Sequence, residues 1–251
     1  MAIAAGVIAW FGVAPVTKWE GLLRDAAERM RPLAEMNTRL IELSSGRTSG
    51  GKDSPARIGE DLAALTGSLP PTTPEEFRRC MAQLSVKCGR GASELLEAAT
   101  VRMPRHFATT EALCRQLLQV AVEEASLGKG AAAEEDSLRA EELAGRFAAT
   151  RPNSSALGLL GNVQSGRFEF AHNPKSLNDA IASWSRAAAL DPYGTTFPLR
   201  MFRTLTAAGR MDEARIWAEK LLHLDLLQRL DPLKRLTPEE IAAVKSILDS
   251  K

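Results

Sequence analysis

Residues 180–192, AIASWSRAAALDP, and residues 214–226, ARIWAEKLLHLDL, share one helical pattern and begin 34 residues apart. Each stretch opens on an alanine, Ala180 or Ala214, has apolar residues at its fifth and eighth positions, and has an aspartate at its twelfth. A small residue lets two antiparallel helices approach closely, and a bulky residue one turn later fills the remaining space. The two stretches therefore predict a repeated pair of packed helices.

A third copy of the pattern lies upstream, where Ala140, Ala144, Phe147 and Pro152 keep the same offsets. Ala140 and Ala180 are 40 residues apart rather than 34, so about one and a half helical turns have been inserted. We expect the insertion between Gly166 and Lys175.

The first helix of each predicted pair also carries a pattern. Leu157, Leu160 and Gly161 keep the spacing of a W-x2-L-G element with Leu in place of Trp, and Gly209 to Met211 form a turn before the second helix. With the 34-residue period, these features resemble tetratricopeptide repeats over about Glu134 to Leu226. The resemblance implies antiparallel helix pairs stacked as a short α-solenoid, whose concave face holds a peptide or a partner helix. An unrelated helical bundle is the alternative.

The composition supports an all-α fold. The chain has 251 residues, of which 45% are hydrophobic and only 5% aromatic, and it has many alanines. Alanine is the best helix former, whereas strands favour aromatic and β-branched residues. The formal net charge is +1, so no general positive field would attract nucleic acid, and acidic residues interleave with the basic ones. We therefore expect no nucleic-acid partner.

No residue set indicates catalysis. The three cysteines, Cys80, Cys88 and Cys114, form no C-x-x-C pair and lie in apolar helical contexts, where free cysteine behaves as a small hydrophobe. The three histidines are far apart, without the spacing of a helical metal site. We expect no catalytic, metal-binding or cofactor-binding residues in this chain, and hence no enzyme activity of its own.

Two Thr-Pro-Glu-Glu sequences, at 73–76 and 237–240, predict helix starts. In each, the threonine can accept a hydrogen bond from the backbone amide of the second glutamate, and that glutamate can reach back to the threonine amide. Capping explains these carboxylate pairs better than acid–base chemistry does.

The amino-terminal run Ala2 to Val16 has no charged residue over fifteen positions, fewer than the roughly 20 that span a bilayer upright. We expect this run to associate with a membrane; a secretory signal and a buried core helix are the alternatives. Basic residues follow it at Lys18, Arg24, Arg29 and Arg31, which favours a cytoplasmic position for the remaining chain.

Residues 44–54 have no apolar periodicity and read as a flexible linker. Gly46, Gly51 and Lys52 have the spacing of a phosphate-binding loop, but Asp53 stands where Ser or Thr would hold magnesium. The segment also follows a helix instead of a strand. We therefore expect no nucleotide binding.

These observations divide the chain into consecutive parts. We expect an apolar membrane-associated segment at 1–16, an amphipathic helix at 17–43 divided or kinked at Pro32, a linker at 44–54, a helical layer at 55–133, the repeats at 134–226 and a capping helix at 227–251. Within the helical layer, we expect separate helices near Ser54–Leu65, Thr73–Val86, Ala92–Val101 and Thr110–Leu127.

Two functions fit this organisation. The first is a membrane-tethered interaction module that binds a protein or peptide, with Asn162, Gln164, Leu199, Arg203 and Thr206 on its binding face. Arg203 is the candidate for a carboxylate contact, because guanidinium binds carboxylate in bidentate fashion. The second rests on a layout that resembles the carboxyl-terminal region of bacterial O-antigen ligase or polymerase-like membrane proteins. It implies an accessory domain of a glycan-processing enzyme whose catalytic part lies outside this chain.

Overall fold

The computed structural model describes residues 20–44, 54–229, 231 and 235–249, and the secondary structure of these residues is entirely helical. The predicted apolar segment at 1–16 lies outside the described residues. Most of the predicted linker also lies outside them, including Gly46, Gly51 and Lys52, which have the spacing of a phosphate-binding loop. The helices are α2 (Glu20–Ser44), α3 (Pro55–Thr66), α4 (Pro74–Arg102), α5 (Phe107–Ser126), α6 (Gly130–Thr150), α7 (Ser154–Ala171), α8 (Pro174–Leu190), α9 (Thr196–Ala207), α10 (Met211–Leu227) and α11 (Pro238–Asp249). The predicted all-α fold is confirmed.

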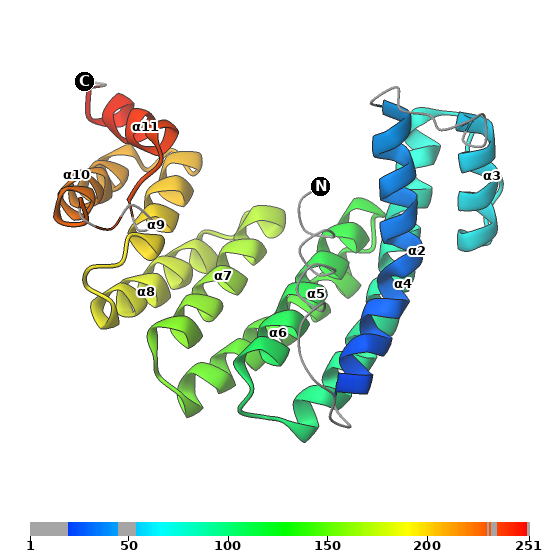
Figure 1. Ribbon diagram of the computed structural model, residues 1–251, viewed down its shortest axis with the longest axis horizontal. Coiled ribbons are helices and arrows are strands. Elements are labelled where there is room, and N and C mark those ends of the chain that lie inside the picture. Colours follow the sequence, from blue (N-terminus) through cyan, green and yellow to red (C-terminus); the bar gives the residue numbers. More distant parts are fainter. Residues whose placement is uncertain (1–19, 45–53, 230, 232–234, 250–251) are drawn as a thin grey trace. The chain divides into compact units, whose positions relative to one another are not determined.

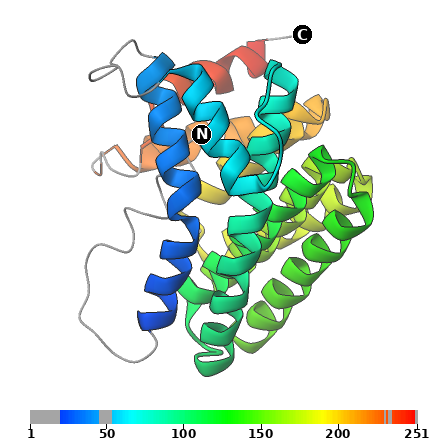
Figure 2. The same cartoon turned by 90° about the vertical axis from the view of Figure 1, so that its right-hand side faces the viewer.

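The chain divides into two compact units, Met1–Leu143 and Ala144–Lys251, with the boundary inside α6. In the first unit, α4 packs against both α2 and α5, and the short α3 covers α4 and α2 near the end of α2 (Figures 1 and 2). Ile58, Leu62 and Leu84 are almost fully buried at these contacts. The burial of apolar side chains between consecutive helices therefore holds this unit together.

The prediction of separate helices at Thr73–Val86 and Ala92–Val101 is wrong, because α4 runs unbroken through both. Gly89 and Gly91 lie inside it, where glycine lowers helix propensity. Packing outweighs that cost, since a Cβ atom at Gly89 would lie only 2.6 Å from Val120 Cγ2 of α5. The glycine thus lets α4 and α5 approach closely instead of ending the helix.

Helix starts follow the predicted capping chemistry. Thr73 Oγ1 accepts a hydrogen bond from the Glu76 amide at 3.2 Å, and Glu76 Oε2 accepts one from the Thr73 amide at 3.1 Å. Thr237 and Glu240 form the same reciprocal pair at the start of α11. Pro32 was predicted to kink or divide its helix. It does not divide it, because Pro32 lies within the continuous α2; the kink stays a prediction.

The second unit contains two antiparallel helix pairs, which carry the repeated stretches that open at Ala180 and Ala214. Helix α7 packs on α8, α9 packs on α10, and α8 and α11 extend the packing by contacts with α9 and α10 respectively (Figure 1). Ala180 of α8 and Ala214 of α10, the residues that open the two repeated stretches, are completely buried in one core cluster with Trp184 and Leu221. The 34-residue spacing therefore marks equivalent helix contacts.

Two glycines of α7 allow this helix to pack closely against α8 and α9. A Cβ atom at Gly161 would lie 2.5 Å from Trp184 Cδ1 of α8, and one at Gly158 would lie 2.3 Å from Phe197 Cε1 of α9. Glycine is required at both positions because neighbouring aromatic rings occupy the space of a side chain. One helix thus contacts its own partner and the first helix of the next pair.

The structure also explains the slip in the repeat period. Helix α7, which lies between Ala140 and Ala180, has 18 residues, and α9, which lies between Ala180 and Ala214, has 12. The difference of 6 residues equals the difference between the two spacings, 40 and 34. The extra turns end at Ala171, within the predicted Gly166 to Lys175 interval. His172 then closes the helix in a left-handed conformation with φ of 50°.

Candidate partner-binding groove

A groove of about 680 Å³ lies within the second unit, and we call it the second-unit groove. Its walls come from the carboxyl half of α7, from α9, and from the segments that precede α9 and α11. Three of the five predicted binding-face residues, Asn162, Leu199 and Arg203, line it. The structure therefore places residues from two successive first helices around one hollow.

Asn162 supports the groove wall from α7. Its Oδ1 accepts a hydrogen bond from the indole Nε1 of the buried Trp184 at 3.0 Å. This bond uses one of the two lone pairs of the oxygen, and the amide nitrogen of Asn162 is the donor group of the side chain.

The other two predicted residues do not line the groove. Gln164 is only 8% exposed, and its Oε1 accepts a hydrogen bond from Ser183 Oγ of α8 at 2.8 Å. Thr206 donates through Oγ1 to the Phe202 carbonyl of its own helix at 2.8 Å. The structure thus gives Gln164 a place in the α7–α8 contact.

Arg203 forms an ion pair with a carboxylate of the same chain, that of Glu240. Its Nη2 donates to Glu240 Oε1 at 2.7 Å, and the Arg203 side chain is 61% exposed. The other oxygen of Glu240 accepts from the Thr237 amide, which caps α11. One glutamate therefore links the start of α11 to the groove face of α9.

A second ion pair fixes the segment that leads into α11. Arg235 donates to Asp225 through Nε at 3.2 Å and Nη2 at 2.7 Å, and the Leu236 amide donates to the same carboxylate at 2.9 Å. These hydrogen bonds hold the pKa of Asp225 below its usual value. Asp225 is the aspartate of the repeated pattern, and its counterpart Asp191 lines the groove.

Most of the charged groove residues were not predicted from the sequence, among them Glu169 of α7 and Arg200 of α9. Arg200 precedes Arg203 by three positions, a spacing that puts both on one helix face and could have identified it. Glu169 lies in the inserted turns of α7, which have no counterpart in the next repeat. Burial raises the pKa of its carboxyl group.

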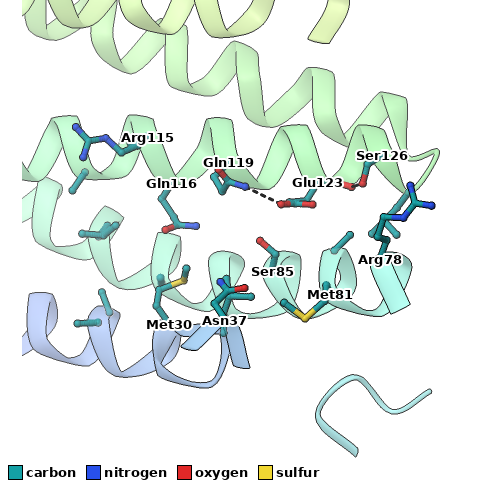
Figure 3. A pocket seen from close by; sticks show the side chains of 18 of the residues that line it. Met30, Asn37, Arg78, Met81, Ser85, Arg115, Gln116, Gln119, Glu123 and Ser126 are labelled. Carbon is teal, nitrogen blue, oxygen red and sulfur yellow. Dashed lines mark hydrogen bonds between the residues drawn. The ribbon is translucent and has the colours of Figure 1, made fainter. Parts of the chain in front are cut away.

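A second hollow, of about 970 Å³, lies in the first unit between α2, α4 and α5, and we call it the first-unit groove. Figure 3 shows Gln119 and Glu123 side by side on α5, with Ser85 and Met81 of α4 across from them and Met30 of α2 farther along. Gln119 Nε2 donates to Glu123 Oε1 at 2.9 Å. Burial nevertheless raises the pKa of Glu123. No sequence pattern had marked these residues as a site.

The cysteines behave as buried apolar residues. Cys80, Cys88 and Cys114 are free and buried, and burial raises the pKa of the Cys114 thiol to about 12. A thiol of this kind is a poor nucleophile at neutral pH. Across the described part of the chain, no cluster of three or more His, Cys, Asp or Glu side chains is placed to bind a metal ion.

No described helix combines the length and the apolar character needed to cross a membrane. This finding does not extend to the residues before Glu20.

No protein-family model matches the chain, and no curated protein matches its sequence. Among solved structures, it is similar to a thermophilic TPR protein of Thermus thermophilus, with 18% identity, a TM-score of 0.47, and coverage of 77% of this chain and 97% of that one. It is also similar to the MamA RS-1 ArsTM double mutant, with 16% identity, a TM-score of 0.41, and coverage of 81% and 98%. Because both TM-scores are below 0.5, the helix-pair architecture rests on the packing described above.

Proposed function

We propose that the chain is a helical-repeat interaction module that binds a protein or peptide in the second-unit groove. The observation that carries this proposal is the position of Arg203, a largely exposed guanidinium on the groove wall that already binds a carboxylate of the same chain. A partner carboxylate could replace Glu240 at Arg203, because both would use the same planar donors. Leu199, one turn earlier on α9, would contact an apolar side chain of that partner.

The balance of charges in the groove favours a peptide with both an acidic and an apolar residue. Arginines at 200, 203 and 235 and acidic residues at 169, 191 and 240 line the same groove. A strongly basic or strongly acidic partner would therefore meet both repulsion and attraction in the groove. Specificity would come from one well-placed carboxylate next to an apolar contact.

A displayed library of random peptides, selected on the full chain, tests this proposal. We expect the enriched sequences to share an acidic residue near an apolar one. Their affinity should fall about tenfold in Arg203→Ala and in Leu199→Ala, the usual effect of losing one central contact of about 1.4 kcal/mol.

Arg186→Ala is the matched control, because Arg186 is exposed on α8 and does not line the groove. Peptides whose binding is lost equally in Arg186→Ala, or retained in both groove variants, would contradict the proposal.

We further propose that Ala2 to Val16 tethers the module to a membrane, with the repeats on the cytoplasmic side. The support is the absence of charge across the run and the basic residues that follow it. A full chain and a chain that starts at Thr17 should separate into membrane and soluble fractions respectively, even after a high-salt wash that screens electrostatic contacts. A full chain found entirely in the soluble fraction would refute the tether.

A further inference from the structure

The first-unit groove has an apolar floor that no described helix covers. Met30 and Leu33 of α2 and Ala82 and Leu96 of α4 are buried along it, and half-buried alanines form its edges. The charged side chains of Glu75, Arg78, Arg79 and Arg115 lie at its rim, and Gln119 and Glu123 line its α5 side. A hollow of this composition suits an uncharged occupant with an apolar face toward α2 and α4.

We propose that, in the absence of a membrane, Ala2 to Val16 of the same chain docks in the first-unit groove as a helix antiparallel to α2. This inference goes beyond the tether proposed above, because it concerns the segment in lipid-free water and holds whether or not the segment also binds lipid. The occupant is chosen by its length, its position and its chemistry.

Position and length fit the groove. The groove face of α2 extends from Ala26 to Asn37, about 16 Å along the helix axis at 1.5 Å per residue. Ala2 to Val16, with fifteen residues, would form a helix of about 22 Å. Only residues 17–19 separate it from the start of α2 at Glu20, and a connection of two to five residues is typical of an antiparallel helix hairpin.

The chemistry fits as well. The segment has no charged side chain to bury, and Ala4, Ala5 and Gly6 are small enough to allow close approach to α2. Its large apolar residues, among them Trp10 and Phe11, would otherwise be exposed to water.

The test places a photo-crosslinking residue, p-benzoylphenylalanine, at Ile8 of the full chain, in dilute buffer without lipid or detergent. After irradiation, mass spectrometry identifies the peptides joined to position 8. We expect products of monomer mass, linked to α2, α4 or α5.

Ala112→Glu supplies the matched perturbation. Ala112 is half-buried on α5 and lines the groove, so a glutamate there can reach water when the groove is empty but would be buried when it is occupied. The crosslink yield should fall about tenfold in this variant, and Ala27→Glu on α2 should have the same effect. Ala98→Glu, exposed on α4 and outside the groove, should leave the yield unchanged.

Three results would overturn the docking: products of dimer mass, crosslinks confined to residues 144–251, or yields that both groove variants leave unchanged. Circular dichroism of each variant before irradiation verifies that the helical fold is intact. If one of the two groove variants, Ala112→Glu or Ala27→Glu, is not folded, the other one provides the test. The lipid tether is tested separately by the fractionation described above, so failure of one proposal does not imply failure of the other.

Discussion

Replacing Gly161 by alanine tests whether α7 and α8 approach each other as closely as the structure shows. Gly161 is buried, and a Cβ atom there would lie 2.5 Å from Trp184 Cδ1, 2.6 Å from Nε1 and 2.9 Å from Cγ. Ordinary contacts between carbon atoms are about 3.5–4.0 Å. The added methyl group must therefore displace the indole ring or separate the two helices.

The indole has little room to move, because Trp184 is only 1% exposed and belongs to the core cluster with Ala180, Met201 and Ala214. Overpacking of a well-packed core costs about 1–3 kcal/mol. Displacement would also lengthen the hydrogen bond from Trp184 Nε1 to Asn162, which contributes about 1 kcal/mol. Alanine regains about 1 kcal/mol of helix propensity. We therefore expect Gly161→Ala to lower the free energy of unfolding by about 2 kcal/mol.

Urea unfolding, followed by far-UV circular dichroism and by tryptophan fluorescence, measures this difference. The control is Gly145→Ala in α6, where the added Cβ would meet no atom within 4 Å. At Gly145 the substitution gains helix propensity and creates no clash, so it should raise the free energy of unfolding by about 1 kcal/mol. If Gly161→Ala were as stable as Gly145→Ala, the close contact between α7 and Trp184 would be refuted.

Two further predictions concern the repeats. Ala180→Arg and Ala214→Arg should each unfold the surrounding helix pair, because both positions are completely buried and an arginine there would be an unpaired buried charge; thermal unfolding of the exposed Ala131→Arg should match the parent. Asp225→Asn should lower the unfolding temperature by a few degrees at pH 7, because the variant loses the charge that binds Arg235. Since the pKa of Asp225 is lowered in the folded state from the usual 3.8, its contribution is present above that value and is lost at lower pH; a gap between parent and variant that persists well below that pH would contradict this explanation.

Local chemistry allowed several features to be predicted from sequence. The capping pairs of Thr73 with Glu76 and of Thr237 with Glu240 depend on atoms three residues apart, so a short motif contains all their partners. The repeat period was visible for a related reason. A buried helix contact imposes a small residue at a fixed helical position, and the same contact recurs in each pair, as at Ala180 and Ala214.

The continuity of α4 was not predictable in this way. Residues 87–91 contain two glycines and two basic residues, and their local preference is for a break. What keeps them helical is α5, whose Val120 and Gln116 pack against Gly89. The partner that decides the conformation lies about thirty positions farther along the chain.

The sequence by itself determined the helical character of the chain, the capping pairs of α4 and α11 and the spacing of the core residues, because each depends on hydrogen bonds or side-chain periodicity within one or two helical turns. Only the tertiary structure decided which residues line the grooves and which hydrogen bonds and ion pairs their side chains form. Arg203 was selected from the sequence as a carboxylate-binding residue, but its partner Glu240 is 37 residues away. Gln164 was assigned to the same face, yet it is buried against α8. Which residues face a groove depends on how the helices pack, and many distant contacts set that packing together.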